Sequence, residues 1–512
     1  MARTPGRTPR RGARQGRQGV AAGRPVGDPA RRVALDVLLA VADRDAYANL
    51  LLPQLLAQRQ LAGRDAALAT ELTYGTLRGR GTYDAVLAIC SDRDLDSLDL
   101  VVREVLRLGT HQLLATRIQP HAAVATSVNL VKEVAGQRPA GFVNAVLRKV
   151  ATRDLPSWLG IAAPARDADP VGHLAVRYSY PEWVVEAFAA ALGEVPGGDM
   201  QQTEAALAAG SERPAVHLCV VPGLADREEL VAAGCTPARW SPFGAYLPDG
   251  DPAAIDAVAA GRAGVQDEAS QLAAAALTRV GLSEASAARG GEIQRTRPGK
   301  AAAWQGEYWL DTCAGPGGKA RLLAGLAAGT GARLVAAEMR EHRARLVRSA
   351  VTPATPAGSA TPAGSAGVIV ADGTKPAWPA AGFDRVIADV PCSGLGALRR
   401  RPEARWRRTA ADVRALGGLQ RDLLAAALDA ARPGGVVAYV TCSPHLAETQ
   451  EVVADVLARR PGVQVLDAPA VLPEVPDISA GPGGRYAQFW PHIHGTDAIF
   501  LALLRQAGPA DT

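Results

Sequence analysis

Two cysteines stand where a thiol could do chemistry. Cys392 lies in the segment Asp389-Val-Pro-Cys-Ser-Gly394 and Cys442 in Thr441-Cys-Ser443, and each follows an apolar run that predicts a β-strand. A free cysteine is usually just a small buried apolar side chain. At the end of a strand that opens into a cleft, a thiolate can instead serve as a nucleophile. Two neighbouring thiols could also form a redox pair, and the residue types alone leave both open.

A glycine-rich segment, Asp311-Thr-Cys-Ala-Gly-Pro-Gly-Gly-Lys319, is the second chemical signal. It follows the apolar, aromatic run 308–310 and precedes residues 320–328, which predict a helix. A strand, a glycine turn and a helix in this order are typical of sites for adenosine-type cofactors, because glycine lets the backbone approach the ligand and the helix start offers free N–H groups. The spacing matches neither the dinucleotide nor the P-loop fingerprint, so the turn alone is a modest indication.

Acidic residues follow the predicted strands of the same region. Glu338, Asp372 and Asp389 each end an apolar run, and Asp311 precedes the glycine turn. Alternating strands and helices predict a parallel, doubly wound sheet, in which ligands lie at the carboxyl ends of the strands. We expect Glu338 to accept hydrogen bonds from ribose hydroxyls and Asp372 to hold the adenine amino group. Asp311 would pack under the turn, and Asp389 would face the reaction centre. A single acidic residue of this kind is often only a helix cap.

The elements that must carry this site divide into segments. Residues 1–28 have the composition of a disordered basic tail. Apolar residues at three-to-four spacing predict an all-helical domain over 29–155. A linker is expected over 156–170, a small α+β module over 170–262 and the sheet domain over 263–506. The expected breaks in the helical domain are Gly63, Gly79, Gly109, Pro120 and Gly136.

Two further stretches predict surface insertions rather than chemistry. Residues 281–305 are polar and basic, and residues 355–366 hold a tandem Thr-Pro-Ala-Gly-Ser-Ala repeat.

Charge and composition narrow the class of protein. The first 27 residues carry seven arginines and no acid, which leaves −2 for the rest of a chain whose net charge is +5. Such a tail is expected to contact phosphate backbones, or simply to aid solubility. The six cysteines form no Cys-x-x-Cys pair, so neither a zinc site nor a disulfide framework is expected. The scattered cysteines favour a reducing cytoplasm. No apolar run reaches the roughly 20 residues of a membrane span, and a monomer is the default expectation.

Taken together, these segments resemble a known family. The set Asp-x-Cys-Ala-x-Pro-Gly-Gly-Lys, Asp-x-Pro-Cys-Ser-Gly and Thr-Cys-Ser looks like the RNA 5-methylcytosine methyltransferases. The pieces Arg107-Leu-Gly-Thr-His-Gln-Leu113 and Phe142-Val-Asn-Ala-Val-Leu-Arg148 resemble the NusB-like RNA-binding helical domain. With both, the chain is similar to the RsmB (Sun/Fmu) family, which methylates 16S ribosomal RNA. The resemblance covers about residues 30–505.

The resemblance implies a multi-domain protein with an all-α NusB-like domain, a small α+β module and a Rossmann-like domain that uses S-adenosylmethionine. It implies that Cys442 is the nucleophile, that Cys392 assists product release and that Asp389 holds the cytosine. Lys319 would approach the target or the methionine carboxylate. The cofactor site would be lined by Cys313, Ala314, Gly315, Pro316, Gly317, Gly318, Lys319, Glu338, Asp372 and Asp389.

The chain departs mildly from the family pattern. Gly315 stands where alanine is frequent, and Glu338 where the family usually has the shorter aspartate. Val390 replaces a small residue. Thr449 replaces an asparagine after Glu448, which puts the support of the Thr-Cys loop in doubt.

An arginine-rich stretch just after the first cysteine is a candidate RNA contact. Residues 399–408 hold six arginines and a tryptophan, and Arg401, Arg405 and Trp406 are the residues expected to bind RNA. The plainer interpretation is a solvated charged face. Two other functions stay open: the same chemistry on another RNA such as tRNA, and a non-catalytic RNA-binding assembly factor.

Overall fold

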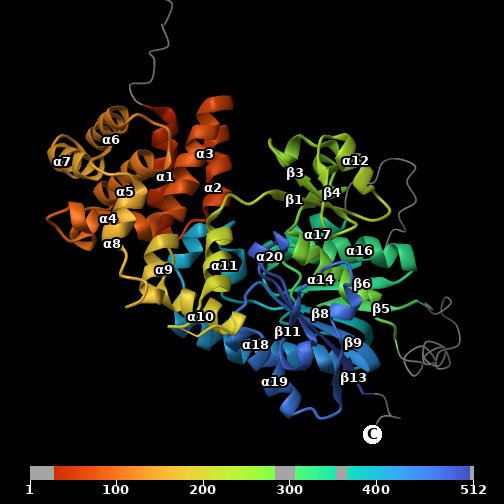
Figure 1. The fold of residues 1–512 in the computed structure, drawn as a ribbon. Coiled ribbons are helices and arrows are strands. Elements are labelled where there is room, and N and C mark those ends of the chain that lie inside the picture. The colour runs from red at the N-terminus through yellow and green to blue at the C-terminus, as the bar shows by residue number, and fades with distance from the viewer. Residues whose placement is uncertain (1–27, 196, 283–305, 353–365, 508–512) are drawn as a thin grey trace, which may run out of the picture.

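The computed structural model describes residues 28–195, 197–282, 306–352 and 366–507 of the chain (Figure 1). The basic tail (1–27), most of the insertion 281–305 and most of the repeat at 355–366 therefore lie outside the described residues.

The N-terminal domain is all helical, as the apolar periodicity predicts. Its helices are α1 (Pro29–Arg44), α2 (Ala48–Gln58), α3 (Gly63–Arg78), α4 (Arg80–Cys90), α5 (Leu100–Ala115), α6 (Pro120–Ala135), α7 (Ala140–Val150) and α8 (Leu155–Ala162). They pack their apolar faces into one core, with α5 near its centre.

Two expectations for this region are wrong. Gly109 does not break a helix but lies inside α5, where a Cβ atom would come 2.6 Å from Cδ1 of Leu147 on α7. Glycine is needed there because the two helices approach closely. The expected linker 156–170 begins with α8, whose Trp158 is buried and donates a hydrogen bond from Nε1 to the Val150 carbonyl at 2.9 Å.

Residues 170–262 form two packing units rather than one. The helices α9 (Pro170–Tyr178), α10 (Glu182–Leu192) and α11 (Gln201–Ser211) share a core with Leu395 and Trp490 of the last domain. A four-stranded sheet of order β2-β3-β1-β4 follows and has its own core. Its elements are β1 (Val216–Val220), α12 (Arg227–Ala232), β2 (Thr236–Pro237), β3 (Gly244–Leu247), α13 (Asp256–Ala259) and β4 (Ala263–Val265).

The last domain is built on a nine-stranded sheet of order β11-β12-β13-β9-β8-β5-β6-β7, with β10 paired to β13. Its strands are β5 (Tyr308–Asp311), β6 (Arg333–Glu338), β7 (Ala366–Val370), β8 (Phe383–Asp389), β9 (Ala431–Thr441), β10 (Val463–Val465), β11 (Ser479–Ala480), β12 (Tyr486–Gln488) and β13 (Phe500–Gln506). Strands β5 to β9 are parallel, but β13 runs antiparallel to β9. The expected parallel arrangement is confirmed for β5 to β9, and the strands β10 to β13 add antiparallel pairs, so the whole sheet is mixed.

Helices cover both faces of this sheet, so its central strands are apolar on both sides. Trp309 and Ile387 face the core shared with α14 (Glu268–Arg279), α16 (Gly318–Thr330) and α17 (Glu341–Val351). Leu310 and Val386 face the opposite core, shared with α18 (Ala410–Ala430) and α19 (Gln450–Ala458). The short helix α20 (Pro491–His494) precedes β13. This period-two alternation fixes the register of the strands.

The strand order reverses beside β5, which has β6 on one side and β8 on the other. Parallel α/β sheets bind ligands at the carboxyl ends of the strands where the order reverses. The glycine turn follows β5 and Asp389 ends β8, so the topology brings both to this position.

The arginine-rich stretch holds the helical domain against the last domain. Arg405 is fully buried and donates to the carbonyls of four residues: Arg78, Tyr178, Ser179 and Gly210, at 2.8–3.3 Å. Its guanidinium lies 3.7 Å from the ring centroid of Tyr180. Nearby, the Ala48 N–H donates to Glu403 Oε1 at 3.2 Å. We call residues 399–408 the arginine clasp.

Arg405→Lys should loosen this junction. Lysine keeps the charge but replaces a planar fork of donors with a single ammonium. Each buried carbonyl left unpaired costs about 1–3 kcal/mol, so we expect the melting temperature to fall by roughly 3–8 °C. The matched control is Arg408→Lys, an exposed position in the same clasp, where a change within about 0.5 kcal/mol is expected. Equal melting curves for the two variants would contradict the clasp.

Candidate active site

The glycine turn is anchored to both neighbouring strands. The Thr312 N–H donates to Ile387 O of β8 at 3.0 Å, and the Ala314 N–H donates to Ala337 O of β6 at 2.9 Å. The peptide bond between Gly315 and Pro316 is cis. Gly317 has φ +116° and caps α16, and a Cβ there would lie 2.7 Å from Cβ of Ala350. The turn therefore requires glycine at 317 on both conformational and packing grounds.

Glu338 ends β6 beside this turn, as its position predicts. Its carboxylate accepts a hydrogen bond from the Arg340 N–H at 2.9 Å and is 5% exposed. A Cβ on Gly315 would lie only 2.1 Å from Glu338 Oε2. The Glu338 side chain, which is longer than an aspartate, therefore occupies space that is free only because residue 315 is a glycine. Met339, the next residue, is 59% exposed and presents an apolar surface that the sequence did not single out.

Asp372 follows β7 on the next strand. The Ala371 N–H donates to Glu338 O at 3.2 Å, which places Asp372 near the end of β6. Its Oδ1 accepts hydrogen bonds from the Thr374 N–H at 3.0 Å and the Thr374 hydroxyl at 2.8 Å. These bonds lower the pKa of Asp372. The aspartate is therefore anionic and fixed in place at neutral pH.

Asp311 is fully buried under the turn, as expected. Its Oδ1 accepts the Cys313 N–H at 3.2 Å, while Oδ2 has no partner among the described residues. Burial and the negative charge of Asp389 raise the pKa of Asp311 to about 7. A carboxyl group with this pKa changes its protonation state near physiological pH.

Lys319 and Asp389 form an ion pair across the ends of β5 and β8. Lys319 Nζ lies 2.9 Å from Asp389 Oδ2, and the lysine is 8% exposed. Burial lowers the pKa of Lys319, but its pairing with Asp389 outweighs that effect, so the net pKa is raised. The two residues were predicted to have separate roles, and the structure joins them in one ion pair.

The structure also brings Cys392 and Cys442 together. Both residues are partly exposed. The neighbouring Cys442 thiol, together with burial, raises the pKa of Cys392 well above its usual value. Cys392 therefore keeps its proton. Burial raises the pKa of Cys313 to about 12, so this third cysteine is a packing residue of the turn.

A buried carboxylate joins the two cysteine loops. Glu448 is fully buried, and its oxygens accept the Ser393 N–H at 2.7 Å, the Ser393 hydroxyl at 2.5 Å and Gln420 Nε2 at 3.2 Å. The hydroxyl of Ser393 lies 3.2 Å from that of Ser443. We call these four residues the loop bracket. Its serines went unassigned in the sequence, although a serine directly follows each cysteine.

One glycine and one threonine complete the support of the Cys442 loop. The Gly396 N–H donates to Cys442 O at 2.9 Å, and a Cβ on Gly396 would lie 1.9 Å from Ala498 O. Thr449, whose replacement of asparagine raised doubt, donates from its hydroxyl to His445 O at 3.0 Å. The loop therefore keeps a polar tether at this position.

A buried ionic cluster lies behind Gly396. Arg399 contacts Asp497 at 2.6 Å and Asp267 at 2.9 Å, and Arg400 contacts the same two carboxylates at 3.0 and 2.8 Å. The two aspartate side chains are each 7% exposed. Burial and the hydrogen bond to His217 act oppositely on Asp267, and the surrounding charges leave its pKa well below the usual value. Nothing in the spacing of 267, 399 and 497 signalled this cluster.

The three residues predicted to contact RNA differ in their exposure to solvent. Arg401 is exposed and lies over the ring of Tyr47 at 5.5 Å. Trp406 is half-buried against Gly81 and under Arg80. Arg405 is buried with its donors committed to carbonyls, so its expected contact with RNA is wrong for this structure. Charge density in the sequence could not tell a surface arginine from one that bridges domains.

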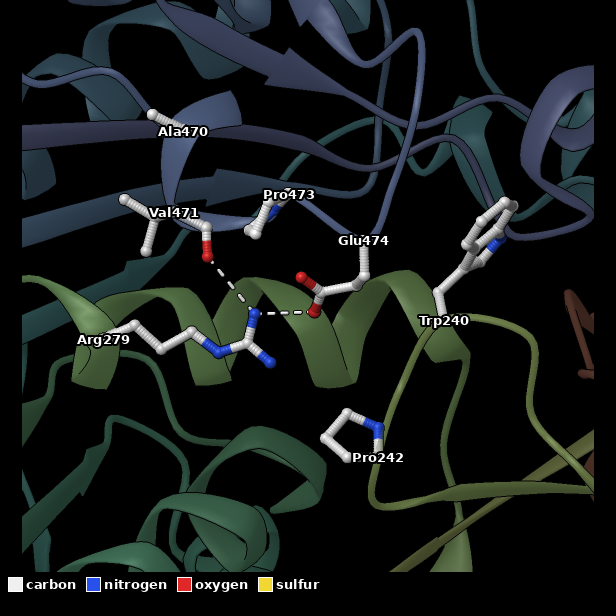
Figure 2. A pocket seen from close by; sticks show the side chains of 7 residues that line it. All are labelled: Trp240, Pro242, Arg279, Ala470, Val471, Pro473 and Glu474. Carbon is white, nitrogen blue, oxygen red and sulfur yellow. Dashed lines mark hydrogen bonds and ion pairs between the residues drawn. The ribbon is translucent and has the colours of Figure 1, made fainter.

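A cavity of about 630 Å³ lies away from this chemistry. Figure 2 shows it beside α14, between the loop of Trp240 and Pro242 and the loop of Val471 and Glu474. Arg279 there pairs with Glu474 at 2.6 Å, which neutralises its charge. The cavity has none of the residues expected to act on a substrate.

Within the described ranges, no group of three or more His, Cys, Asp or Glu side chains could hold a metal ion. In that part of the chain no helix is long and apolar enough to cross a membrane.

Comparisons with known proteins agree with this geometry. Residues 302–505 match the family model described as 16S rRNA methyltransferase RsmB/F, and residues 28–152 match that of the NusB family. The chain is 50% identical to Putative methyltransferase Rv1407 of Mycobacterium tuberculosis H37Rv, over 94% of this chain and 97% of that protein. It is 30% identical to Ribosomal RNA small subunit methyltransferase B of Pseudomonas putida, over 85% of this chain and 91% of that protein.

A solved structure titled Crystal Structure of PH0851 has the same fold, with a TM-score of 0.71 at 19% identity, over 94% of this chain and 99% of that one. The fold and the matches define an S-adenosylmethionine-dependent RNA methyltransferase with a NusB domain. The chain belongs to the RsmB/F family of 16S rRNA methyltransferases.

The raised pKa of Asp311 predicts how the free energy of unfolding depends on pH. Its folded-state pKa of about 7 lies above its usual 3.8, so the protonated form is favoured on folding. The group costs no stability below pH 4, and its ionisation destabilises the fold progressively as the pH rises to 7, by roughly 4 kcal/mol at most. Asp311→Asn, which stays neutral, should gain stability over the natural protein across that interval.

The measurement is urea unfolding at pH 5 and pH 8 without cofactor. Asp372→Asn is the control, because the pKa of Asp372 is lowered and shows no such cost. Parallel pH profiles for Asp311→Asn and the natural protein would show that Asp311 is ionised throughout.

Proposed function

We propose that the protein forms 5-methylcytosine in 16S ribosomal RNA through a covalent bond between Cys442 and carbon 6 of the cytosine. The observation that carries the proposal is the pair of thiols at the ends of β8 and β9, next to the Lys319–Asp389 ion pair. A cytosine that enters this cleft would meet a nucleophile, a protonated thiol and a charge pair within one site.

The residues around the glycine turn fit S-adenosylmethionine. Glu338 offers a buried carboxylate to the ribose hydroxyls, and the lack of a Cβ on Gly315 lets this carboxylate lie against the turn. Asp372 would accept the adenine amino group, and Met339 would cover an adenine face. The turn 313–319 would supply backbone N–H groups to the methionine end. When bound, the cofactor supplies the methyl group that carbon 5 accepts.

The chain's own residues account for the rest of the reaction. The Cys442 thiolate adds to carbon 6, and the ring electrons then make carbon 5 nucleophilic. Asp389 would hold the nitrogen edge of the cytosine, with Lys319 keeping the aspartate in place. After carbon 5 has accepted the methyl group, a base removes its proton and the carbon–sulfur bond breaks, which returns Cys442 as a thiolate. Cys392, which keeps its proton, would assist this release.

The two matched families support the proposed substrate class. The Pseudomonas relative is named a ribosomal RNA small subunit methyltransferase, and the helical domain is of the NusB family. The cytosine must be unpaired or flipped out to reach the thiols. A hairpin loop of 16S ribosomal RNA would present such an unpaired cytosine.

Cysteine variants separate the two thiol roles. Cys442→Ser should abolish methyl transfer, because serine is a far weaker nucleophile at carbon 6. Cys392→Ala should still form the bond but release it slowly, so a protein–RNA adduct that survives denaturing electrophoresis is expected. Cys90→Ala, a buried cysteine in the core of the helical domain, is the matched control and should retain activity. Full turnover by Cys442→Ser would refute the nucleophile assignment.

Bisulfite sequencing of RNA from a deletion strain tests the substrate. Loss of one 5-methylcytosine in 16S ribosomal RNA is expected. Loss in a transfer RNA instead would keep the chemistry and change the substrate. No change in either RNA would favour the non-catalytic assembly factor.

The fit of Gly315 to Glu338 predicts a compensating pair. Gly315→Ala should weaken S-adenosylmethionine binding at least about 10-fold, because its methyl group would displace the carboxylate and cost a charge-assisted hydrogen bond. Adding Glu338→Asp withdraws that carboxylate by one methylene. The double variant should therefore bind more tightly than Gly315→Ala alone. Calorimetry on all four proteins measures the coupling, and strictly additive losses would mean that the two positions are independent.

A further inference from the structure

Three polar residues, Gln266, Asp267 and Glu268, are buried together where β4 leads into α14. Asp267 is engaged by the ionic cluster, and Glu268 accepts the Trp240 and Ser241 N–H groups at 2.5 and 2.7 Å. Gln266 is 6% exposed, and its Nε2 lies 3.4 Å from Ser270 Oγ. Its Oε1 has no hydrogen-bond partner among the described residues. It is thus a buried acceptor left unused.

The backbone holds Gln266 in one place. Its N–H donates to His217 O at 3.0 Å, and its carbonyl accepts Gln271 Nε2 at 2.9 Å. The side chain is aimed at the start of α16, since an ideal Cβ on Gly318 would lie 3.7 Å from Gln266 Cδ. Gly317 caps α16 without a side-chain hydrogen bond. The amide of Gln266, with its unused oxygen, therefore lies beside the start of α16.

This arrangement suits a zwitterion. The first N–H groups of a helix attract a carboxylate, while an amide oxygen accepts from an ammonium group. Of the carboxyl groups close to this turn, Asp389 is already paired with Lys319 at 2.9 Å, Glu338 accepts the Arg340 N–H at 2.9 Å, and burial raises the pKa of Asp311 to about 7. An unpaired buried acceptor is costly, and a ligand amine would satisfy it.

We propose that Gln266 Oε1 accepts a hydrogen bond from the α-ammonium group of the methionine end of S-adenosylmethionine. The carboxylate of that same end lies at the first turn of α16. The assignment rests on the cofactor site proposed above and adds a residue from outside the glycine turn. Gln266 becomes a cofactor-specificity residue, because it distinguishes ligands that carry an amino-acid end from those that lack one.

The test compares two ligands by calorimetry. S-Adenosylhomocysteine carries the amino-acid end, and 5′-methylthioadenosine lacks it. Gln266→Met keeps the length of the side chain but removes the acceptor. A hydrogen bond to a charged group of this kind predicts that its affinity for S-adenosylhomocysteine falls about 10- to 100-fold. Its affinity for 5′-methylthioadenosine should not change.

Two further variants complete the design. Gln266→Glu keeps an acceptor oxygen and should bind S-adenosylhomocysteine far more tightly than Gln266→Met. Gln266→Ala removes the amide without adding a bulky side chain. It replaces Gln266→Met in the comparison if the methionine variant does not fold. Unchanged binding of S-adenosylhomocysteine by Gln266→Met, or an equal loss for both ligands, overturns the proposal. If the natural protein binds neither ligand, the proposed cofactor site itself fails.

Discussion

The buried carboxylate of Glu448 is the constraint on which the candidate active site depends. It holds Ser393 by both the main chain and the hydroxyl, and Ser393 in turn lies 3.2 Å from Ser443. Each serine directly follows one of the two cysteines. A buried carboxylate is stable only where its oxygens are hydrogen-bonded, so the two loops cannot separate without exposing or orphaning this charge. The distance between the thiols is thus set by a group that does not react.

The sheet supplies the coarse placement that this bracket refines. Parallel strands β5, β8 and β9 end at one edge, which brings Asp311, Asp389 and Thr441 together from positions up to 130 residues apart. Strand ends alone position side chains only loosely. Gly396 fixes the Cys442 loop more closely. Its N–H donates to the Cys442 carbonyl, and its lack of a Cβ leaves room for the Ala498 carbonyl. The antiparallel strand β13 carries the chain on from Ala498 and pairs with β9.

The sequence predicted the parts that depend on local pattern. Strand ends at Glu338 and Asp389 follow from apolar runs closed by an acid, and the helical domain follows from three-to-four spacing. The predicted helix break at Gly109 was wrong, because a glycine required by helix packing looks the same in the sequence as one that ends a helix. The short antiparallel strands β11 and β12 were missed because two or three residues show no period. The ionic cluster was beyond reach, since it joins residues 267, 399 and 497 through tertiary contacts alone.

The arginine clasp shows why charge alone is a poor guide to binding. An arginine-rich stretch after a catalytic loop predicts an RNA surface, yet Arg399 and Arg405 are buried and use their donors on carboxylates and carbonyls. Burying a guanidinium is costly unless its donors are satisfied; both terminal nitrogens of Arg405 donate to carbonyls, while its Nε has no partner among the described residues. The clasp begins three residues after Gly396 and ends against the helical domain. A single segment therefore ties the position of the NusB domain to the loop of Cys442. An RNA held by that domain would be presented to the thiols at a distance set by the chain itself.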